Sequence, residues 1–123
     1  MSQHDFEIAN QNAAPSRADI NSALQALASS NSGTSEPSTT YAGQIWIDDN
    51  NNLLKIRNEA NSAWITVGEV DQTNGRFNPV IGDWKILLSS TTLVFQYSGA
   101  AKAKLDASGN LICTGNVSGN GEL

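Results

Sequence analysis

The sequence predicts a mainly β protein: an extended N-terminal arm and one short helix, followed by two small β-meander modules. Three observations support this fold class. Only 15% of the 123 residues are charged, and Asn, Ser, Thr, Gly and Ala are abundant, which suits turns and short strands. From Tyr41 onwards, apolar and polar residues alternate with the two-residue period of a strand. Asn, Asp and Gly, which favour tight turns, separate the alternating stretches.

The first part of the chain, residues 1–40, is predicted to hold an arm, a helix and a linker. In the polar arm "MSQHDFEIANQNAAP", Phe6 and Ile8 are the sizeable apolar side chains. They are two residues apart, so an extended strand would present both on one side. The pair therefore predicts an arm that docks on another surface, and the alternative is a frayed terminus.

A helix is predicted over "SRADINSALQALASS", residues 16–30. Ser16 is expected to cap it, with Asp19 three residues later completing a capping box. Ile20, Leu24 and Leu27 recur at helical spacing and form one narrow apolar stripe. Because a short helix gains most of its stability from packing, we expect this stripe to be covered in a cluster of helices.

The rest of the chain divides into two predicted β-meander modules. Residues 41–70 hold three strand candidates joined by Asn- and Asp-rich turns, "GQIWIDD", "NLLKIRN" and "SAWITVG". Residues 71–82, which contain Asn74-Gly75 and Asn78-Pro79, are predicted as a connector. Residues 83–123 hold four further candidates and a Gly- and Asn-rich end: "DWKILLS", "TLVFQYS", "AKAKLDA" and "NLICTGNV".

The strand patterns also predict which side chains share a face. Ile45 and Ile47 lie on one side of their strand, and Trp46 lies on the other. Each module is too small to bury both of its faces, so we expect identical chains to intertwine and cover them. Four aromatic residues are expected in module packing or interfaces: Trp46, Trp64, Trp84 and Phe95. The alternative for the tryptophans is a platform on which a sugar ring stacks.

Charge and hydropathy exclude two classes of partner. The net charge is −5 and the pI about 4.5, whereas nucleic-acid binding needs Lys and Arg to neutralise phosphates. The N-terminus lacks the basic start and apolar core of a signal peptide, and no apolar run approaches the length of a membrane span. We therefore expect no nucleic acid, no membrane insertion and synthesis in the cytoplasm.

No motif in the chain points to catalysis or a cofactor. His4 is the single histidine and lies in the arm, away from any cleft the β modules could form. The sequence contains no Walker A, GxGxxG, HExxH or CxxC pattern. Cys113 is the single cysteine, and we expect a buried structural thiol rather than a reactive one. These observations favour a protein that is not an enzyme.

One stretch matches the spacing of a calcium-binding loop. In "DDNNNLLKIRNE", Asp48, Asn50, Asn52 and Glu59 occupy the ligand positions of an EF-hand. Leu53 stands where that loop requires glycine, and no helix is predicted on either side. An Asn-rich hairpin turn is therefore the favoured interpretation, with a weak surface cation site as the alternative.

Several segments together resemble the N-terminal region of tail-fibre and related virion proteins of tailed bacteriophages. They are "SQHDFEIANQNAAPSRADINSALQALASSNSG", "EPSTTYAGQIWIDD", "LLKIRNEANSAWITVG" and, near the end, "LDASGNLICTGNVSGNGEL". The resemblance implies a structural virion protein, a homotrimer whose N-terminal part attaches to the particle. Fibres of this type usually continue into a long shaft and a receptor-binding tip, so 123 residues favour an attachment or short-spike role.

The functional hypothesis is therefore a short tail-fibre or fibre-attachment protein located in the virion. Phe6 and Ile8 would dock on another virion protein, in the tail, an adaptor, the collar or the capsid, and the β modules would trimerise. One alternative is a capsid decoration or head-fibre protein. A second alternative, of another class, is a carbohydrate-binding module that contacts host surface glycans.

Overall fold

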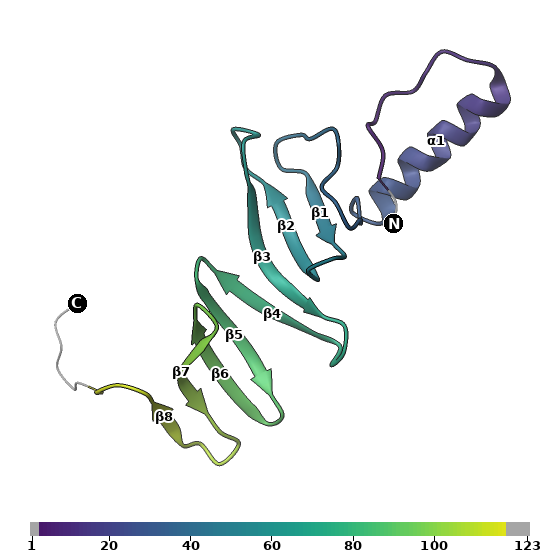
Figure 1. The fold of residues 1–123 in the computed structure, drawn as a ribbon. Helices are drawn as coiled ribbons and strands as arrows, with labels where there is room; N and C mark the ends of the chain where they lie inside the picture. Colours follow the sequence, from purple (N-terminus) through teal and green to yellow (C-terminus); the bar gives the residue numbers. More distant parts are fainter. Residues whose placement is uncertain (1–2, 118–123) are drawn as a thin grey trace.

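The computed structural model describes residues 3–117 and shows one α-helix followed by a single antiparallel sheet (Figure 1). Each strand pairs with its neighbours in sequence, in the order β1 to β8. The prediction of a mainly β fold with one helix is confirmed, and the strand order is that of a meander. The elements are α1 (Ala13–Ala28), β1 (Ile45–Asp48), β2 (Leu53–Arg57), β3 (Trp64–Asp71), β4 (Arg76–Ile81), β5 (Trp84–Ser89), β6 (Thr92–Tyr97), β7 (Ala100–Leu105) and β8 (Leu111–Cys113).

Strand β4 occupies the segment that the sequence predicted as a connector. It pairs with β3 from Arg76 to Pro79, but with β5 only through Val80 and Ile81. A proline cannot donate to a β ladder, so Pro79 lies where the pairing toward β5 has not yet begun. The connector is thus a strand that joins the two predicted meanders into one sheet.

Three hairpins are closed in the same way, by an aspartate that bonds an asparagine in the turn. Asp48 accepts a hydrogen bond from Asn51 Nδ2 at 2.9 Å, and Asp71 accepts one from Asn74 Nδ2 at 2.8 Å. Asp106 accepts one from Asn110 Nδ2 at 2.9 Å. Each aspartate also accepts a backbone N–H of its turn, a local bonding pattern that favours turns over helix.

One face of the sheet is apolar from β1 to β8. Directly opposed residues of neighbouring strands share a face, and successive residues of one strand alternate between faces. The pairings therefore place the following side chains on a single face: Ile45, Ile47, Leu54, Ile56, Ile65, Val70, Phe77, Pro79, Ile81, Trp84, Ile86, Leu88, Leu93, Phe95, Tyr97, Ala103, Leu105, Leu111 and Cys113. We call it the apolar sheet face.

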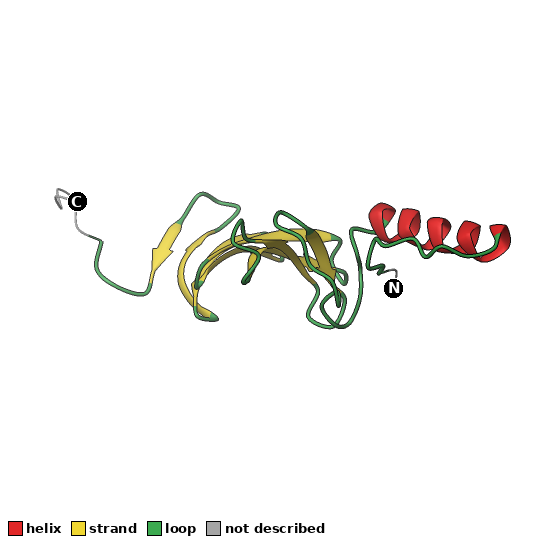
Figure 2. Ribbon diagram, turned by 90° about the horizontal axis from the view of Figure 1, so that it is seen from above, coloured by secondary structure: helices red, strands yellow, loops and turns green. Residues whose placement is uncertain are grey.

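Nothing among the described residues covers this face. Figure 2 shows the sheet as one curved layer, with α1 beyond its end rather than across it. Among the described apolar residues, Ala26, Trp46 and Val94 are the buried ones. The chain exposes 8340 Å², whereas a compact monomer of 13.0 kDa exposes about 6,300 Å². The fold is therefore a layer without a core of its own.

The helix begins three residues earlier than predicted. Ala13 is its first residue, Asn12 is the N-cap, and no side chain caps the helix. The first four N–H groups of a helix have no partner inside it, so Pro15 is tolerated in the first turn. Ser16 is therefore not the cap, and its hydroxyl donates to the carbonyl of Gln11 at 3.0 Å. In the part of the chain that the structure describes, no helix has the length and apolarity to cross a membrane.

Candidate functional site

The apolar sheet face is the largest candidate functional surface. Its β5–β6 region carries an aromatic pair, Trp84 and Tyr97, with ring centroids 5.3 Å apart. Trp84 is 46% exposed and Tyr97 41%. Phe95 lies on the same face between Ile86 and Ala103, its cross-strand partners. These side chains are as apolar as a protein interior but face outward, which marks an interaction surface.

The opposite face is covered in its first half by the chain's own linker. Gly33 forms an isolated parallel bridge with Asp48, and its carbonyl accepts the indole N–H of Trp46 at 3.2 Å. Lys55 Nζ lies 4.4 Å from the centre of the Trp46 ring, on the same face. Trp46 is consequently buried, at 6% exposure, although it does not belong to the apolar sheet face.

The Trp64 side chain also contacts other residues of its own chain. Its ring lies 5.2 Å from that of Trp46, and the guanidinium carbon of Arg57 lies 5.2 Å from its centre. Its indole N–H donates to the Glu36 carboxylate at 2.8 Å. Among the three tryptophans, Trp84 alone keeps an exposed ring, so a sugar-stacking platform built from all three is absent from this arrangement.

Asp48, proposed above as a possible cation ligand, is engaged by protein groups. Lys55 Nζ donates to Oδ2 at 2.7 Å, and the backbone N–H groups of Asn50 and Asn51 donate to Oδ1 at 3.1 Å. Burial raises the pKa of Asp48, but the hydrogen bonds from Lys55 and Asn51 outweigh it, and the net pKa lies below the ordinary value. Within residues 3–117, no group of three or more His, Cys, Asp or Glu side chains is arranged to hold a metal ion.

The N-terminal arm folds back along the helix instead of extending. His4 Nε2 lies 2.8 Å from Asp19 Oδ1, and the backbone N–H of Ala9 donates to Asp19 Oδ2 at 3.1 Å. The His4 hydrogen bond, followed by the Ala9 hydrogen bond, lowers the pKa of Asp19. Asp19 therefore fastens the arm rather than completing a capping box. We call this contact the arm latch.

The two apolar residues of the arm do not share a side. Phe6 has a φ of 64°, a left-handed conformation that interrupts any extended strand, and its ring packs edge-on to Tyr41 at 6.1 Å. Ile8 is exposed. Phe6 thus packs against its own chain, and Ile8 is the apolar side chain of the arm that faces solvent.

The helix stripe faces outward along its whole length. Ile20, Leu24 and Leu27 are all exposed, and Leu27 is the most exposed of them at 62%. No strand makes an extensive contact with α1. The stripe is therefore a second exposed apolar surface, and only its Leu27 end approaches the sheet, at Ile45.

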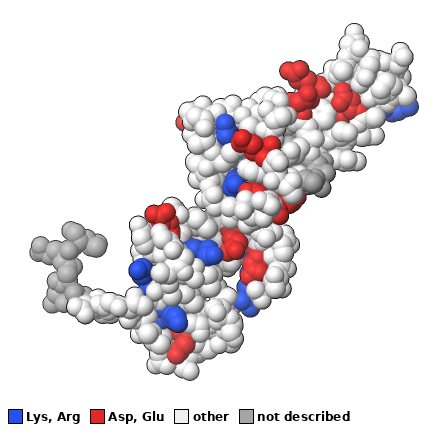
Figure 3. All heavy atoms as spheres, in the orientation of Figure 1, with Lys and Arg blue, Asp and Glu red and all other residues white. Residues whose placement is uncertain are grey.

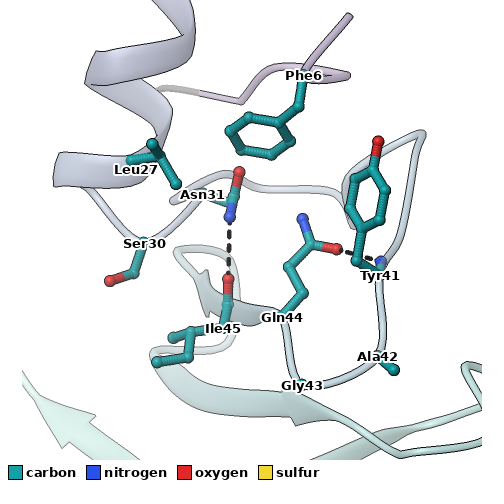
Figure 4. A pocket seen from close by; sticks show the side chains of 9 residues that line it. All are labelled: Phe6, Leu27, Ser30, Asn31, Tyr41, Ala42, Gly43, Gln44 and Ile45. Carbon is teal, nitrogen blue, oxygen red and sulfur yellow. Dashed lines mark hydrogen bonds between the residues drawn. The ribbon is translucent and has the colours of Figure 1, made fainter.

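A cavity of about 470 Å³ lies where the arm, the end of α1 and the start of β1 meet (Figure 4). We call it the arm pocket. Phe6, Leu27, Tyr41 and Ile45 supply its apolar walls, and Ser30, Asn31 and Gln44 its polar side chains. The sequence analysis did not find this pocket, because its residues are scattered over forty positions and match no motif. No sequence signal marked them, and Gln44 falls inside the predicted strand "GQIWIDD".

Other candidate groups lack a reactive setting. Cys113 is half-buried on the apolar sheet face rather than fully buried as expected. Charges of both signs are dispersed over the face of the molecule in Figure 3, without a patch of one sign. Glu69 and Lys85 form an ion pair of 3.0 Å that joins β3 to β5.

Comparisons with protein-family models, curated proteins and solved structures found no match in any of the three. The candidate surfaces therefore have to be interpreted from their own chemistry.

Proposed function

We propose that the chain is a self-assembling structural protein, whose apolar sheet face is covered by identical chains. The observation that carries this proposal is an apolar face that runs across eight strands without cover. Burying apolar surface contributes about 25 cal/mol per Å². A single layer forgoes most of that contribution, so association would supply what the fold lacks.

The proposed assembly is a homotrimer, a number that comes from the sequence resemblance and not from the geometry. Three sheets arranged with their apolar faces inward would enclose Trp84, Phe95 and Tyr97. The exposed stripe of Ile20, Leu24 and Leu27 would meet its equivalents in a cluster of helices. Polar side chains of the opposite face, such as Lys85, would remain in water.

The proposed location is a bacteriophage virion, as a short tail fibre or fibre-attachment protein. The resemblance of residues 2–68 to fibre proteins supports this location. In that setting the function is mechanical, and the N-terminal region would anchor the assembly to another virion protein. The fold, with its exposed apolar sheet and helix, suits a role in which association is permanent.

Light scattering on the purified chain at several concentrations tests the proposal. We expect a constant mass of about three times 13.0 kDa and tryptophan emission that is already blue-shifted. A monomer that unfolds cooperatively would overturn it, because a stable monomer cannot leave this face in water.

The exposed Trp84–Tyr97 pair favours one competing function, which is binding of a glycan by stacking. The two proposals place Trp84 differently: the assembly buries it, whereas a glycan site needs it in water. Quenching by acrylamide separates them. We expect Trp84 to be shielded, and emission changes on addition of sugars would instead support the glycan site.

A further inference from the structure

The two ring nitrogens of His4 have different partners. Nδ1 accepts the backbone N–H of Phe6 at 2.8 Å, and Nε2 lies 2.8 Å from Asp19 Oδ1. An ionised carboxylate can only accept, so Nε2 carries the proton in this pairing and Nδ1 is the lone-pair nitrogen. The His4 side chain is only 9% exposed. The ring is therefore neutral in this arrangement, and its two partners fix the tautomer.

A second acceptor lies beside Nδ1 of His4. Asp5 Oδ1 is 3.3 Å from that nitrogen, and it accepts the backbone N–H of Glu7 at 3.0 Å. An unprotonated Nδ1 and a carboxylate are both acceptors, so they cannot bond each other. A proton on Nδ1 reverses both relations, because it opposes the N–H of Phe6 and attracts the carboxylate of Asp5. Protonation of this nitrogen therefore exchanges its partner.

The charged groups that face His4 favour this exchange. The cavity beside the ring is lined by Asp5 and Glu7 of the arm, Asp19 of α1 and Ser38 of the linker, and the described residues around it supply no Lys or Arg. Three carboxylates without a cation attract a positive charge on the ring. Histidine ordinarily gains its charge between about pH 8 and pH 5, so mild acid is sufficient to drive the exchange.

The hydrogen bond to His4 holds Phe6 in an unfavourable backbone conformation. Phe6 has a φ of 64°, in the left-handed region that bulky side chains rarely adopt. In this conformation its ring lies 5.9 Å from that of His4 and 6.1 Å from that of Tyr41. The Tyr41 hydroxyl also donates to the carbonyl of Asp5 at 3.0 Å. When Nδ1 stops accepting, Phe6 loses the bond that offsets this strain.

We propose that His4 is a proton-operated switch of the N-terminal arm. The neutral ring holds Phe6 against Tyr41, whereas the protonated Nδ1 binds the carboxylate of Asp5 and releases Phe6. This inference needs neither the trimer nor the virion, since every group that it uses lies within a single chain.

The arm latch at Asp19 persists in both states of the switch. A protonated His4 still donates from Nε2, and the hydrogen bond from the N–H of Ala9 to Asp19 Oδ2 does not involve the ring. The arm therefore stays attached to α1 while Phe6 leaves the surface of its own chain. Ile8 is already exposed, so release of Phe6 gives the arm two outward apolar side chains instead of one.

Nuclear magnetic resonance of the full chain between about pH 8 and pH 5 tests the proposal. Nitrogen shifts of the His4 ring report its protonation, and nuclear Overhauser effects report the contact between the Phe6 and Tyr41 rings. As His4 gains its proton, we expect this ring contact to be lost and the amide protection of Phe6 to fall about tenfold. The amide protection of Ala9 should not change. A ring contact that persists once His4 is protonated would overturn the proposal.

Two substitutions of His4 separate its two hydrogen bonds. His4→Asn keeps an acceptor at the position of Nδ1, since an asparagine side chain accepts the N–H two residues on. His4→Gln keeps a donor near the position of Nε2 but no acceptor for Phe6, and neither side chain titrates. We expect Phe6 to contact Tyr41 at both ends of the pH range in His4→Asn and at neither end in His4→Gln. A ring contact in His4→Gln equal to that of the unsubstituted chain, or one that still depends on pH in either variant, would show that other groups position Phe6.

Discussion

Each half of the sheet carries a pair of packed aromatic rings, but the two pairs differ in how far they are buried. Trp46 and Trp64 in the first half have ring centroids 5.2 Å apart at 59°, and Trp84 and Tyr97 in the second have centroids 5.3 Å apart at 56°. The geometries are almost identical. Yet Trp46 is 6% exposed and Trp84 is 46% exposed.

The linker accounts for the difference. The segment after α1 passes over the first pair, where Gly33 and Glu36 accept the two indole N–H groups. The second pair lies on the apolar sheet face, and the described residues 114–116 border it in a cavity but leave it exposed. Local aromatic packing is therefore not sufficient for burial, which needs a second layer. The first half takes that layer from its own chain, and in the proposed assembly the second half obtains it from another.

A charge on the apolar sheet face of β6 should have the largest effect on assembly. We expect Phe95→Glu to abolish assembly, because each copy would bury an unpaired carboxylate in the interface. Gln96→Glu adds the same charge one residue away, on the opposite face beside Lys85, and should leave the assembly intact. Light scattering of both variants measures the effect. An unchanged mass for Phe95→Glu would mean that this face stays in water.

Truncating the two tryptophans should have different consequences. We expect Trp46→Ala to lower the free energy of unfolding by about 3–5 kcal/mol, at any protein concentration, because it empties a site closed within the chain. Trp84→Ala should instead make stability depend more strongly on protein concentration, since its partner in the proposed assembly is another copy. Urea denaturation at two protein concentrations distinguishes the effects. The same concentration dependence of stability in both variants would contradict the proposed difference between the halves.

The sequence predicted the secondary structure better than the relations between elements. Alternation showed that Ile45 and Ile47 oppose Trp46, because side-chain direction in a strand follows from local geometry. It missed β4, because Pro79 indicates the end of a strand unless the pairing with β5 is known. It also placed Asp19 in a capping box, whereas the structure uses that carboxylate to hold the arm through His4, fifteen residues earlier. Such contacts depend on the path of the chain, which residue spacing alone does not encode.

The arm pocket could not be predicted from the sequence for the same reason. The Ile45 carbonyl and the Tyr41 N–H decide which atoms of Asn31 and Gln44 stay unpaired. Both partners are backbone groups, and a sequence carries no sign of how backbone groups are paired across fourteen positions. The site residues on the strands were thus accessible to sequence reasoning, and those around the pocket were not.

The first half of the sheet, which the linker covers, should also lose stability in acid. Because the net pKa of Asp48 is lowered in the folded protein, its contribution to stability is present above the ordinary aspartate pKa of about 3.9. That contribution is lost as the pH falls through the lower, folded value. Lys55→Met leaves a buried carboxylate without its cation and should cost about 1–3 kcal/mol near neutral pH.

Acid unfolding followed by circular dichroism checks this expectation. Removing Lys55 raises the pKa of Asp48, so the acid transition of the variant should move to higher pH. Lys104→Met removes a cation from the second half and serves as the control, with no shift expected in that transition. An unmoved transition in Lys55→Met would show that Asn51 and the turn amides hold the carboxylate without help.

The smallest expected effect concerns the arm latch, which lies outside both halves of the sheet. Asp19→Ala removes the acceptor of His4 and Ala9, so the arm should detach from α1 and its amides should exchange faster with solvent. Alanine favours a helix more than aspartate does, so α1 itself should persist. Hydrogen exchange of residues 3–9 and of residues 13–28 measures both outcomes, with Glu7→Ala as a control that removes an exposed carboxylate of the same arm. Faster exchange in α1 together with the arm would mean that the helix depends on the latch, and that the two surfaces at its end, Phe6 and the exposed stripe, form one unit.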